Sequence, residues 1–349
     1  MFPYIDAGLG YSEHMFDMNA ATDILAPWAI RAAVTLRIPD LITDGCATTD
    51  EIAVRANVDP QYLARLVRYL VTIGVFDQSE SGNLGLTKPA EVLLTTHPSG
   101  THVWLNQDGA SGRMDAGWSG LLHAVRTGKP AYDAVFGRSF DEDVAGDTVM
   151  AESWNELMAF GGEDIAPEVR QYAASVWQEA HHVVDIGGGT GALLIELLMA
   201  YPQLRGTLLE IPAAALKASE NFSSVGLSHR TCCVSGSFFD AVPDGGDVYV
   251  LSCILHNWCD DSASDILRRC ARTAGAGRRV VVVERVVEAG AVDEKRVAAL
   301  DMHMMLLGGG RERSSSEYSD LLRDAGVNLV KSGRLPSGRM LFEGVIRSS

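Results

Sequence analysis

The second half of the chain alternates short apolar runs with stretches of helical periodicity. Runs that are continuously apolar and rich in β-branched residues are typical of strands buried on both faces of a parallel sheet. The predicted strands are residues 182–186, 207–210, 231–234, 248–251 and 280–284. Two later apolar segments, 327–330 and 340–346, predict a terminal β-hairpin. The pattern therefore predicts an α/β fold: a doubly wound, Rossmann-like domain over residues 179–349.

The first hundred residues follow a different pattern, with short helices and then a hairpin. Residues 20–35 are helix-periodic, Thr49 opens a short helix, and Asp59 followed by Pro60 predicts the start of another helix running to Thr72. Two apolar runs, at 75–77 and 84–87, flank a turn-rich segment. We predict a winged helix over residues 1–100, and a mostly helical linker over 101–178 that contributes to a substrate pocket.

Charge changes how this winged helix is interpreted. The 349 residues carry 29 basic and 45 acidic side chains, a net charge of −16, and residues 1–100 alone hold six Lys/Arg against twelve Asp/Glu. That sign opposes binding to nucleic acid or to an anionic membrane. The domain is therefore predicted to support dimerisation rather than to bind DNA.

Two further features of the sequence predict a cytoplasmic location. No stretch has the charge and apolar pattern of a secretory signal, and none approaches the roughly 18 apolar residues of a membrane span.

The six cysteines form no C-x-x-C pair and are predicted to be free, buried thiols, with a reactive thiol at Cys259 as the alternative.

A glycine-rich loop follows the first predicted strand. It begins at Asp185 and places glycines at 187, 189 and 191, directly before a helical pattern over 192–200. Such a loop brings backbone N–H groups close to a ligand, but it also satisfies the relaxed dinucleotide fingerprint. Glu210 ends the second predicted strand, 19 residues after Gly191, where a carboxylate can accept hydrogen bonds from ribose hydroxyls. An adenosine-containing ligand is therefore predicted, with either NAD or S-adenosylmethionine open at this point.

The segment after the fourth predicted strand is more specific. It reads Leu255-His256-Asn257-Trp258-Cys259-Asp260-Asp261. This resembles the L-H-(D/N)-W-x-D-(D/E) signature of S-adenosylmethionine-dependent small-molecule O-methyltransferases. Further segments that resemble this family are 185–191, 236–239 and 309–314. Residues 25–31, 124–130 and 135–138 resemble its actinomycete natural-product branch, of the carminomycin O-methyltransferase type. The resemblance extends over residues 17–346 and favours S-adenosylmethionine over NAD.

The resemblance implies a set of cofactor-binding residues. These are Asp185, Gly187, Gly189 and Gly191 of the loop, Glu210 for the ribose, Ser237, Phe238 and Trp258 near the adenine, and Ser252 near the methionine end. The product is S-adenosylhomocysteine. Family members usually have Asp where this chain has Ser237, and Cys259 also departs from the family pattern.

His256 is the candidate general base. A phenol with a pKa of about 10 is mostly protonated at neutral pH, and a neutral imidazole can take its proton as the oxygen attacks. The imidazole needs an acceptor on its other nitrogen, and Glu284 and Glu312 match the histidine partners of the family. The alternatives are a salt bridge at a strand end for Glu284, and for Glu312 an acidic residue near the helix opened by the capping box that begins at Ser314.

The acidic pair Asp260 and Asp261 has two interpretations. One is a magnesium site, as in metal-dependent catechol methyltransferases. The preferred one is that the pair caps the following helix and favours its N-terminus electrostatically. No metal is predicted.

The acceptor pocket is implied by the resemblance. Its candidate residues are Trp154, Met158, Asn257, His303 and Met304. Aromatic and methionine side chains ordinarily fill cores, but they would also suit a flat, polyoxygenated aromatic acceptor.

The sequence thus predicts a homodimeric, metal-independent O-methyltransferase that acts on a phenolic hydroxyl of a secondary metabolite. The nearest alternative is a relative that binds S-adenosylmethionine without transferring its methyl group and acts as a hydroxylase or cyclisation catalyst. A winged-helix regulator is a third hypothesis, and the acidic N-terminal domain disfavours it.

Overall fold

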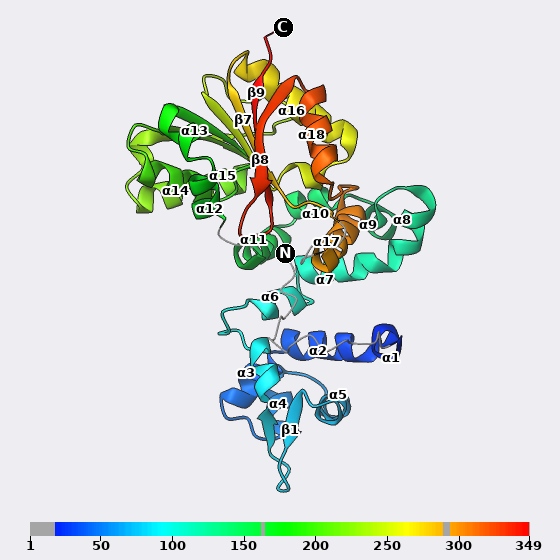
Figure 1. Cartoon of the computed structure of the whole chain (residues 1–349). Helices are drawn as coiled ribbons and strands as arrows, with labels where there is room; N and C mark the ends of the chain where they lie inside the picture. Colours follow the sequence, from blue (N-terminus) through cyan, green and yellow to red (C-terminus); the bar gives the residue numbers. More distant parts are fainter. Residues whose placement is uncertain (1–17, 162–164, 289–293, 349) are drawn as a thin grey trace. The chain divides into compact units, whose positions relative to one another are not determined.

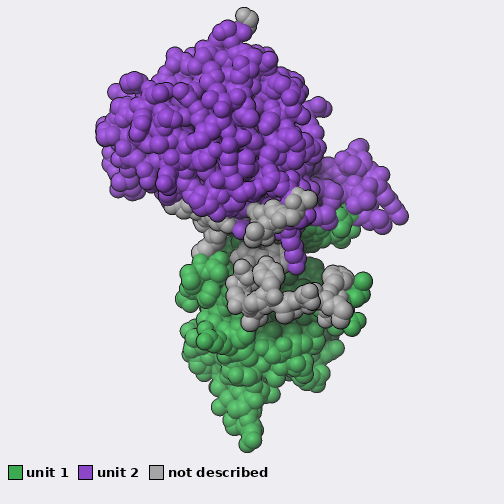
Figure 2. Space-filling model, viewed as in Figure 1, with its two compact units in different colours: residues 1–121, 132–162 green, residues 122–131, 163–349 purple. Residues whose placement is uncertain are grey.

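The computed structural model describes residues 18–161, 165–288 and 294–348, which divide into two compact units (Figure 2). Unit 1 comprises residues 1–121 and 132–162, and unit 2 comprises residues 122–131 and 163–349. The predicted linker is thus shared between the units, and the predicted domain boundaries remain predictions. No helix in the described part of the chain is both long and apolar enough to cross a membrane.

Unit 2 is built on a seven-stranded sheet with the order β5-β4-β3-β6-β7-β9-β8 (Figure 1). Its strands are β3 (His182–Ile186), β4 (Arg205–Glu210), β5 (Thr231–Ser235), β6 (Val248–Ser252), β7 (Arg279–Glu284), β8 (Val327–Arg334) and β9 (Met340–Ile346). Strands β3 to β7 pair in parallel, and β9 pairs antiparallel with both β7 and β8. The predicted parallel sheet and its terminal hairpin are confirmed.

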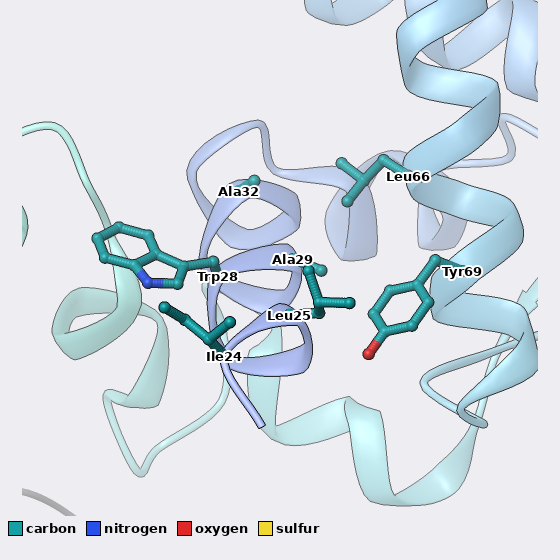
Figure 3. A pocket seen from close by; sticks show the side chains of 7 residues that line it. All are labelled: Ile24, Leu25, Trp28, Ala29, Ala32, Leu66 and Tyr69. Atoms are coloured by element: carbon teal, nitrogen blue, oxygen red, sulfur yellow. The ribbon is translucent and has the colours of Figure 1, made fainter. Parts of the chain in front are cut away.

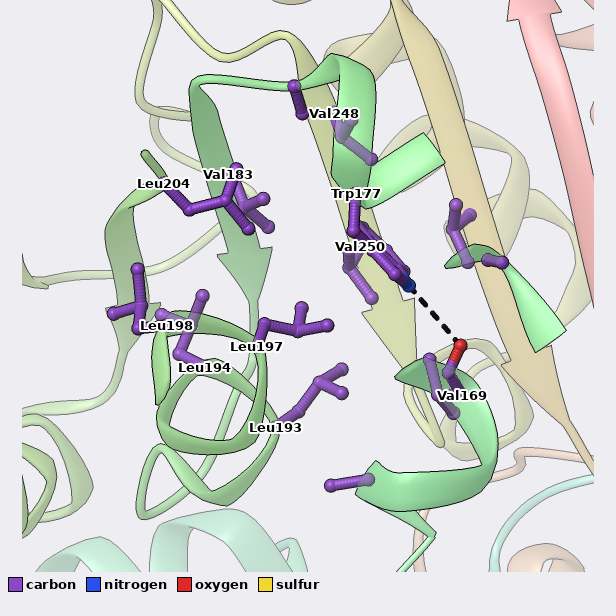
Figure 4. Close-up of a cluster of buried hydrophobic side chains, with 14 of the residues drawn as sticks. Val169, Trp177, Val183, Leu193, Leu194, Leu197, Leu198, Leu204, Val248 and Val250 are labelled. Atoms are coloured by element: carbon purple, nitrogen blue, oxygen red, sulfur yellow. Dashed lines mark hydrogen bonds between the residues drawn. The ribbon is translucent and has the colours of Figure 1, made fainter. Parts of the chain in front are cut away.

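Helices cover both faces of this sheet because successive strand side chains point to opposite faces. Val183, Leu208 and Val250 pack in one cluster with the helices on their face, where the Trp177 indole also donates to the Val169 carbonyl at 3.3 Å (Figure 4). Val184 and Leu251 belong to a second cluster on the other face. The helices of the first face are α12 (Ala166–Tyr172), α13 (Ala174–Glu179), α14 (Ala192–Ala200) and α15 (Pro212–Ser224). Those of the second face are α16 (Asp260–Ala274) and α18 (Ser315–Asp324). The doubly wound architecture predicted from the sequence is confirmed.

Strand β5 corrects one expectation. It is the edge strand of the sheet, so it is not buried on both faces, and Cys232 is exposed while Cys233 is half-buried. All six cysteines are free, but only Cys46 and Cys270 are buried. The prediction of buried thiols was therefore wrong for the other four. For Cys232 and Cys233 the reason is that a β-like run does not tell an edge strand from a central one.

Unit 1 begins with helices followed by a short antiparallel hairpin (Figure 1). Its elements to residue 93 are α1 (Met18–Thr22), α2 (Leu25–Thr35), α3 (Ile38–Thr43), α4 (Thr49–Ala56), α5 (Pro60–Thr72), β1 (Phe76–Gln78), β2 (Leu84–Leu86) and the 3-10 helix η1 (Lys88–Leu93). Asp59 accepts from the N–H groups of Gln61 and Tyr62, as an N-cap should. The predicted single helix over 20–35 is wrong, because Asp23 accepts from the Leu25 N–H at 2.8 Å and interrupts it.

The chain between the hairpin and the large sheet is mostly helical. Its elements are α6 (Thr101–Leu105), α7 (Ala110–Gly117), η2 (Trp118–Gly120), α8 (Leu121–Thr127), α9 (Ala131–Phe136), α10 (Phe140–Gly146) and α11 (Thr148–Gly161). Unit 2 also holds η3 (Ser228–Arg230), η4 (Leu255–Asn257) and α17 (Glu294–Leu307).

Candidate active site

The candidate base lies just beyond the carboxyl end of β6. Ser252 ends this strand, and Cys253 adopts a left-handed conformation, with φ of 57°, that few non-glycine residues take. The chain then turns into η4, which carries His256. Doubly wound sheets place their chemistry at this edge, and a strained residue next to a functional group is a common companion.

His256 is paired with a buried carboxylate. Its Nδ1 lies 2.7 Å from Oε1 of Glu312, and the exposed fractions of the two side chains are 13% and 0%. Because a carboxylate only accepts, Nδ1 donates, and Nε2 keeps the free lone pair. Burial alone would lower the pKa of His256, but the charges of Glu284 and Glu312 and the hydrogen bond together raise it above its ordinary value.

Glu284 has a different role from the one expected. It ends β7, and its Oε1 accepts from the backbone N–H groups of Ile254 at 2.9 Å and Leu255 at 2.7 Å. Burial raises the pKa of Glu284 to about 7, the charge of His256 opposes the rise, and that of Glu312 adds to it. Glu284 therefore holds the backbone before the base and acts on His256 through its charge, whereas Glu312 makes the hydrogen bond.

Three residues that the sequence reasoning missed complete this region. The Glu312 N–H donates to Oδ1 of Asp301 at 2.7 Å, and the buried Arg313 binds backbone carbonyls near the base. A Cβ at Gly310 would lie 2.4 Å from the His256 carbonyl oxygen, so only glycine allows the two segments to approach so closely. The available signals in the sequence were the three consecutive glycines at 308–310 and the charged Arg313 directly after Glu312.

Asp260 and Asp261 do not cap α16, which corrects the preferred interpretation. The helix begins at Asp260, so the capping position falls on Cys259, which makes no side-chain cap. Both carboxylates still lie in the first turn, where the helix dipole favours them. Asp260 forms ion pairs with Arg311 at 3.1 Å and Arg313 at 2.7 Å. Among the described residues, no group of three His, Cys, Asp or Glu side chains is placed to hold a metal ion.

The glycine loop lies between β3 and α14. Gly187, Gly189 and Gly191 have φ of 69°, 57° and 84°, values that L residues rarely adopt. A Cβ at Gly191 would lie 2.6 Å from the ring of Phe222, and one at Gly187 would lie 2.4 Å from the side chain of Ile254. A Cβ at Gly189 would meet nothing within 4 Å, so the loop has open space at its centre.

Two carboxylates lie at this loop, and only one of them is hydrogen-bonded to it. Oε2 of Glu210 accepts from the Gly189 N–H at 3.0 Å, and its Oε1 accepts from Ile211 at 2.8 Å. Asp185 is buried, and neither of its oxygens has a hydrogen-bond partner among the described residues. Burial, together with the charge of Glu210, raises the pKa of Asp185 to about 7. Open glycine backbone beside carboxylate acceptors fits a ligand rich in hydroxyl and amino donors, as the adenosyl cofactor is.

Aromatic rings gather next to the loop. Trp258 contacts Phe238 and Phe239 edge-to-face, with ring centroids 5.8 and 4.7 Å away, and Phe238 lies 3.8 Å from the Cβ position of Gly187. The Ser237 hydroxyl accepts from the Phe239 N–H at 3.1 Å, so it orders its own turn. These rings suit a planar base.

The predicted acceptor residues lie in different units. Asn257 is exposed next to the base, and its amide donates to the Cys253 carbonyl at 3.4 Å. His303 and Met304 are half-buried on α17, the helix whose Asp301 binds the Glu312 N–H. Trp154 and Met158 lie on α11 of unit 1, where the Trp154 ring packs against Phe140 at 5.0 Å and Met158 is exposed.

This sheet, its glycine loop and the carboxylate-held histidine define an enzyme of the doubly wound class that binds an adenosyl cofactor. Residues 118–328 match the family model of the O-methyltransferase domain, and residues 18–96 match that of the O-methyltransferase dimerisation domain. The chain belongs to the O-methyltransferase family and is an S-adenosylmethionine-dependent O-methyltransferase.

Its relatives come from natural-product biosynthesis. The chain is 42% identical to 2,7-dihydroxy-5-methyl-1-naphthoate 7-O-methyltransferase of Streptomyces carzinostaticus, over 89% of this chain and 92% of that one. It is 37% identical to aclacinomycin 10-hydroxylase RdmB of Streptomyces purpurascens, over 92% and 86%. The crystal structure of NcsB1, an O-methyltransferase of neocarzinostatin biosynthesis in complex with S-adenosylhomocysteine and 1,4-dihydroxy-2-naphthoic acid, is similar with a TM-score of 0.85 and 38% identity, over 96% of this chain and all of that one. The resemblance inferred from the motifs is confirmed.

Proposed function

We propose that this enzyme methylates a phenolic hydroxyl of a polyoxygenated aromatic natural product, with His256 as general base and without a metal ion. The observation that carries this proposal is the 2.7 Å hydrogen bond from the imidazole to buried Glu312. The naphthoate in the name of one relative and the naphthoic acid bound in the NcsB1 structure support a fused aromatic acceptor.

The chemistry follows from the base. When bound, S-adenosylmethionine supplies an electrophilic methyl group on a sulfonium whose leaving thioether is neutral, so no acid or metal is needed there. The hydrogen bond to Glu312 directs Nε2 of His256 to take the phenol proton, and the carboxylate then stabilises the imidazolium. The raised pKa of His256 makes it a stronger base than a free imidazole.

The cofactor would be held by the loop glycines and the residues around them. Glu210 keeps lone pairs for ribose hydroxyls beyond its bonds to the backbone. Phe238 and Trp258 would contact the adenine, and Ser252 would lie near the methionine end. Asp185, buried beneath the loop with both oxygens unpaired among the described residues, would offer these oxygens to donors of the cofactor.

The acceptor would contact Asn257, His303 and Met304 near the base, and the family resemblance adds Trp154 and Met158 of α11 as candidates. Met and aromatic side chains adapt to flat rings, and Asn257 can donate to a second oxygen. Alanine variants of these five residues test the assignment. Loss of a residue that contacts the acceptor should raise the KM for the acceptor and leave the cofactor affinity unchanged.

We also propose a homodimer formed through unit 1. A groove of about 510 Å³ between α2 and α5 is lined by Ile24, Leu25, Trp28, Ala29, Ala32, Leu66 and Tyr69 (Figure 3). Leu25 is 65% exposed and Trp28 43% exposed, and an apolar surface of this kind marks an interaction site. The groove lies within the dimerisation-domain match, which supports a second copy as its partner.

Sedimentation velocity tests the dimer. Leu25→Asp should shift the protein to monomer, whereas Val54→Asp, at an 81% exposed position outside the groove, should not. A dimer that survives Leu25→Asp at the same concentration would remove the groove from the interface.

The free state of all six cysteines supports the further proposal of a cytoplasmic location.

Product mass tests the reaction. A panel of phenolic acceptors is incubated with methyl-labelled S-adenosylmethionine and excess EDTA, and a gain of one labelled CH₂ is expected. A gain of one oxygen atom would instead favour the hydroxylase chemistry named for one relative. Loss of methylation under EDTA, restored by Mg²⁺, would overturn metal independence.

A further inference from the structure

Arg313 is an almost completely buried cation beside the base. Its side chain is 1% exposed, and it follows Glu312 directly in the chain. Nη1 donates to the Leu255 carbonyl at 2.9 Å and Nη2 to the Trp258 carbonyl at 2.8 Å. Nε donates to Oδ1 of Asp260 at 2.8 Å, so one planar group binds three points of a single segment.

These contacts surround His256 in the sequence. The first carbonyl belongs to the residue before the base, and the second to the residue two positions after it. A guanidinium presents its donors in a rigid, planar fork. Binding both carbonyls therefore fixes the conformation of the backbone between them as well as its position. The same fork holds Trp258, whose ring packs against the aromatic cluster beside the glycine loop.

The main chain of Arg313 is itself held in place. Arg313 forms a parallel bridge with Val286, and its carbonyl accepts from the Val287 N–H at 3.0 Å, so it is anchored to the segment that directly follows β7. Glu312 binds the imidazole, and Arg313 binds the backbone that carries it.

We propose that Arg313 is a positioning residue of the methyl transfer: it fixes the main chain around His256 so that the base and Glu312 are held in one geometry. This rests on the proposed role of His256 as general base. A small displacement of a base costs much of its rate contribution, while a base that is absent cannot be misplaced.

The test is a double-mutant cycle. Arg313→Met and Arg313→Lys are measured at saturating substrates in the wild-type enzyme and in His256→Ala. We expect Arg313→Met to lower kcat about 100-fold in the wild type. Arg313→Lys, which keeps the charge but cannot bind both carbonyls, should lower it about 10-fold. In His256→Ala each change should cost less than about threefold, because the group that Arg313 positions is gone.

Arg311→Met is the matched control. Arg311 also pairs with Asp260 but is 42% exposed and donates to no carbonyl of the base segment, so its loss should change kcat less than about twofold in both backgrounds. Equal losses for Arg313→Met in both backgrounds would overturn the proposal and leave Arg313 a purely structural residue. If Arg313→Met does not fold, the Lys variant decides by the same criterion. Wild-type turnover of His256→Ala alone would reject the proposed function instead.

Discussion

The base segment and the glycine loop lie at the same edge of one sheet, yet they satisfy their polar groups differently. Around His256, Glu284 and Glu312 each bind protein donors through one oxygen, and only their second oxygen has no hydrogen-bond partner among the described residues. Beneath the glycine loop, Asp185 binds none among the described residues. Burial nevertheless raises the pKa of Asp185 and of Glu284 alike to about 7.

The difference separates carboxylates that the protein itself already hydrogen-bonds through one oxygen from a carboxylate, Asp185, that it leaves entirely to a ligand. Groups already hydrogen-bonded need no reorganisation when charge develops during the reaction, which is how preorganised sites lower barriers. Unpaired groups destabilise the free protein but are available to a ligand. Changes at the base should therefore alter kcat, and changes at the loop should alter binding and stability.

The largest expected effect comes from removing the base. His256→Ala should lower kcat by about 10²–10⁴-fold while the Kd for S-adenosylhomocysteine stays nearly constant. Single-turnover rates and calorimetric titration measure the two quantities, with exposed His229→Ala as control. Unchanged turnover would remove His256 from the mechanism.

Next is the partner of the base. Glu312→Gln should lower kcat about 10–100-fold, because the imidazolium loses its stabilising charge. His256 is a base only when neutral, so kcat falls as the pH drops through its raised pKa. Loss of the Glu312 charge lowers that pKa, and the acid limb of the kcat–pH profile should move to lower pH. An acid limb that stays in place would assign it to another group, and exposed Glu220→Gln should leave the profile unchanged.

The loop should respond in affinity instead. Glu210→Gln should raise the Kd for S-adenosylhomocysteine about 10–100-fold, the range expected for hydrogen bonds to a charged group. At saturating cofactor, kcat should change only a few-fold. Calorimetric titration and saturation kinetics separate the two. A variant that loses kcat and keeps its affinity would break the contrast between the two regions.

The smallest effect concerns the free protein. Because the pKa of Asp185 is about 7, above its ordinary 3.8, the folded state binds the proton more tightly than the unfolded state. Stability from this group is therefore lost as the pH rises through about 7. Asp185→Asn should raise the Tm of the ligand-free protein at pH 8 more than at pH 5, by about 1–2 °C per kcal/mol released. Calorimetry measures the Tm of both proteins at both pH values. An equal change in Tm between pH 5 and pH 8 for the wild type and for Asp185→Asn would contradict the prediction.

Local pattern was enough for much of the fold. The helix predicted over 192–200 has the same bounds in the structure, and the strands fall where the apolar runs lie. Asp59 and the Ser314–Glu317 capping box act as their spacing predicts. Patterns that depend on distant neighbours gave errors: the edge position of β5 exposed Cys232, and Asp23 interrupted an otherwise helical run.

The candidate site likewise contains residues that local pattern identified and residues whose roles depend on distant neighbours. The motif and the resemblance identified His256 and Glu312, but they treated Glu284 as an equal partner and assigned no role to Arg313. The structure gave Glu284 to the backbone, because the ends of β6 and β7 lie side by side. Arg313 and the carbonyl of Leu255 are 58 residues apart, beyond any local pattern.

The sequence by itself determined the sheet, the glycine loop and the family, and it singled out His256 as the candidate base, because these depend on periodicity, on backbone freedom at particular glycines and on residue chemistry. Only the tertiary structure decided which carboxylate holds the imidazole, which holds the backbone and which stays unpaired. Buried polar groups take the partners that packing brings within about 3 Å, and that choice is made by segments far apart in the chain.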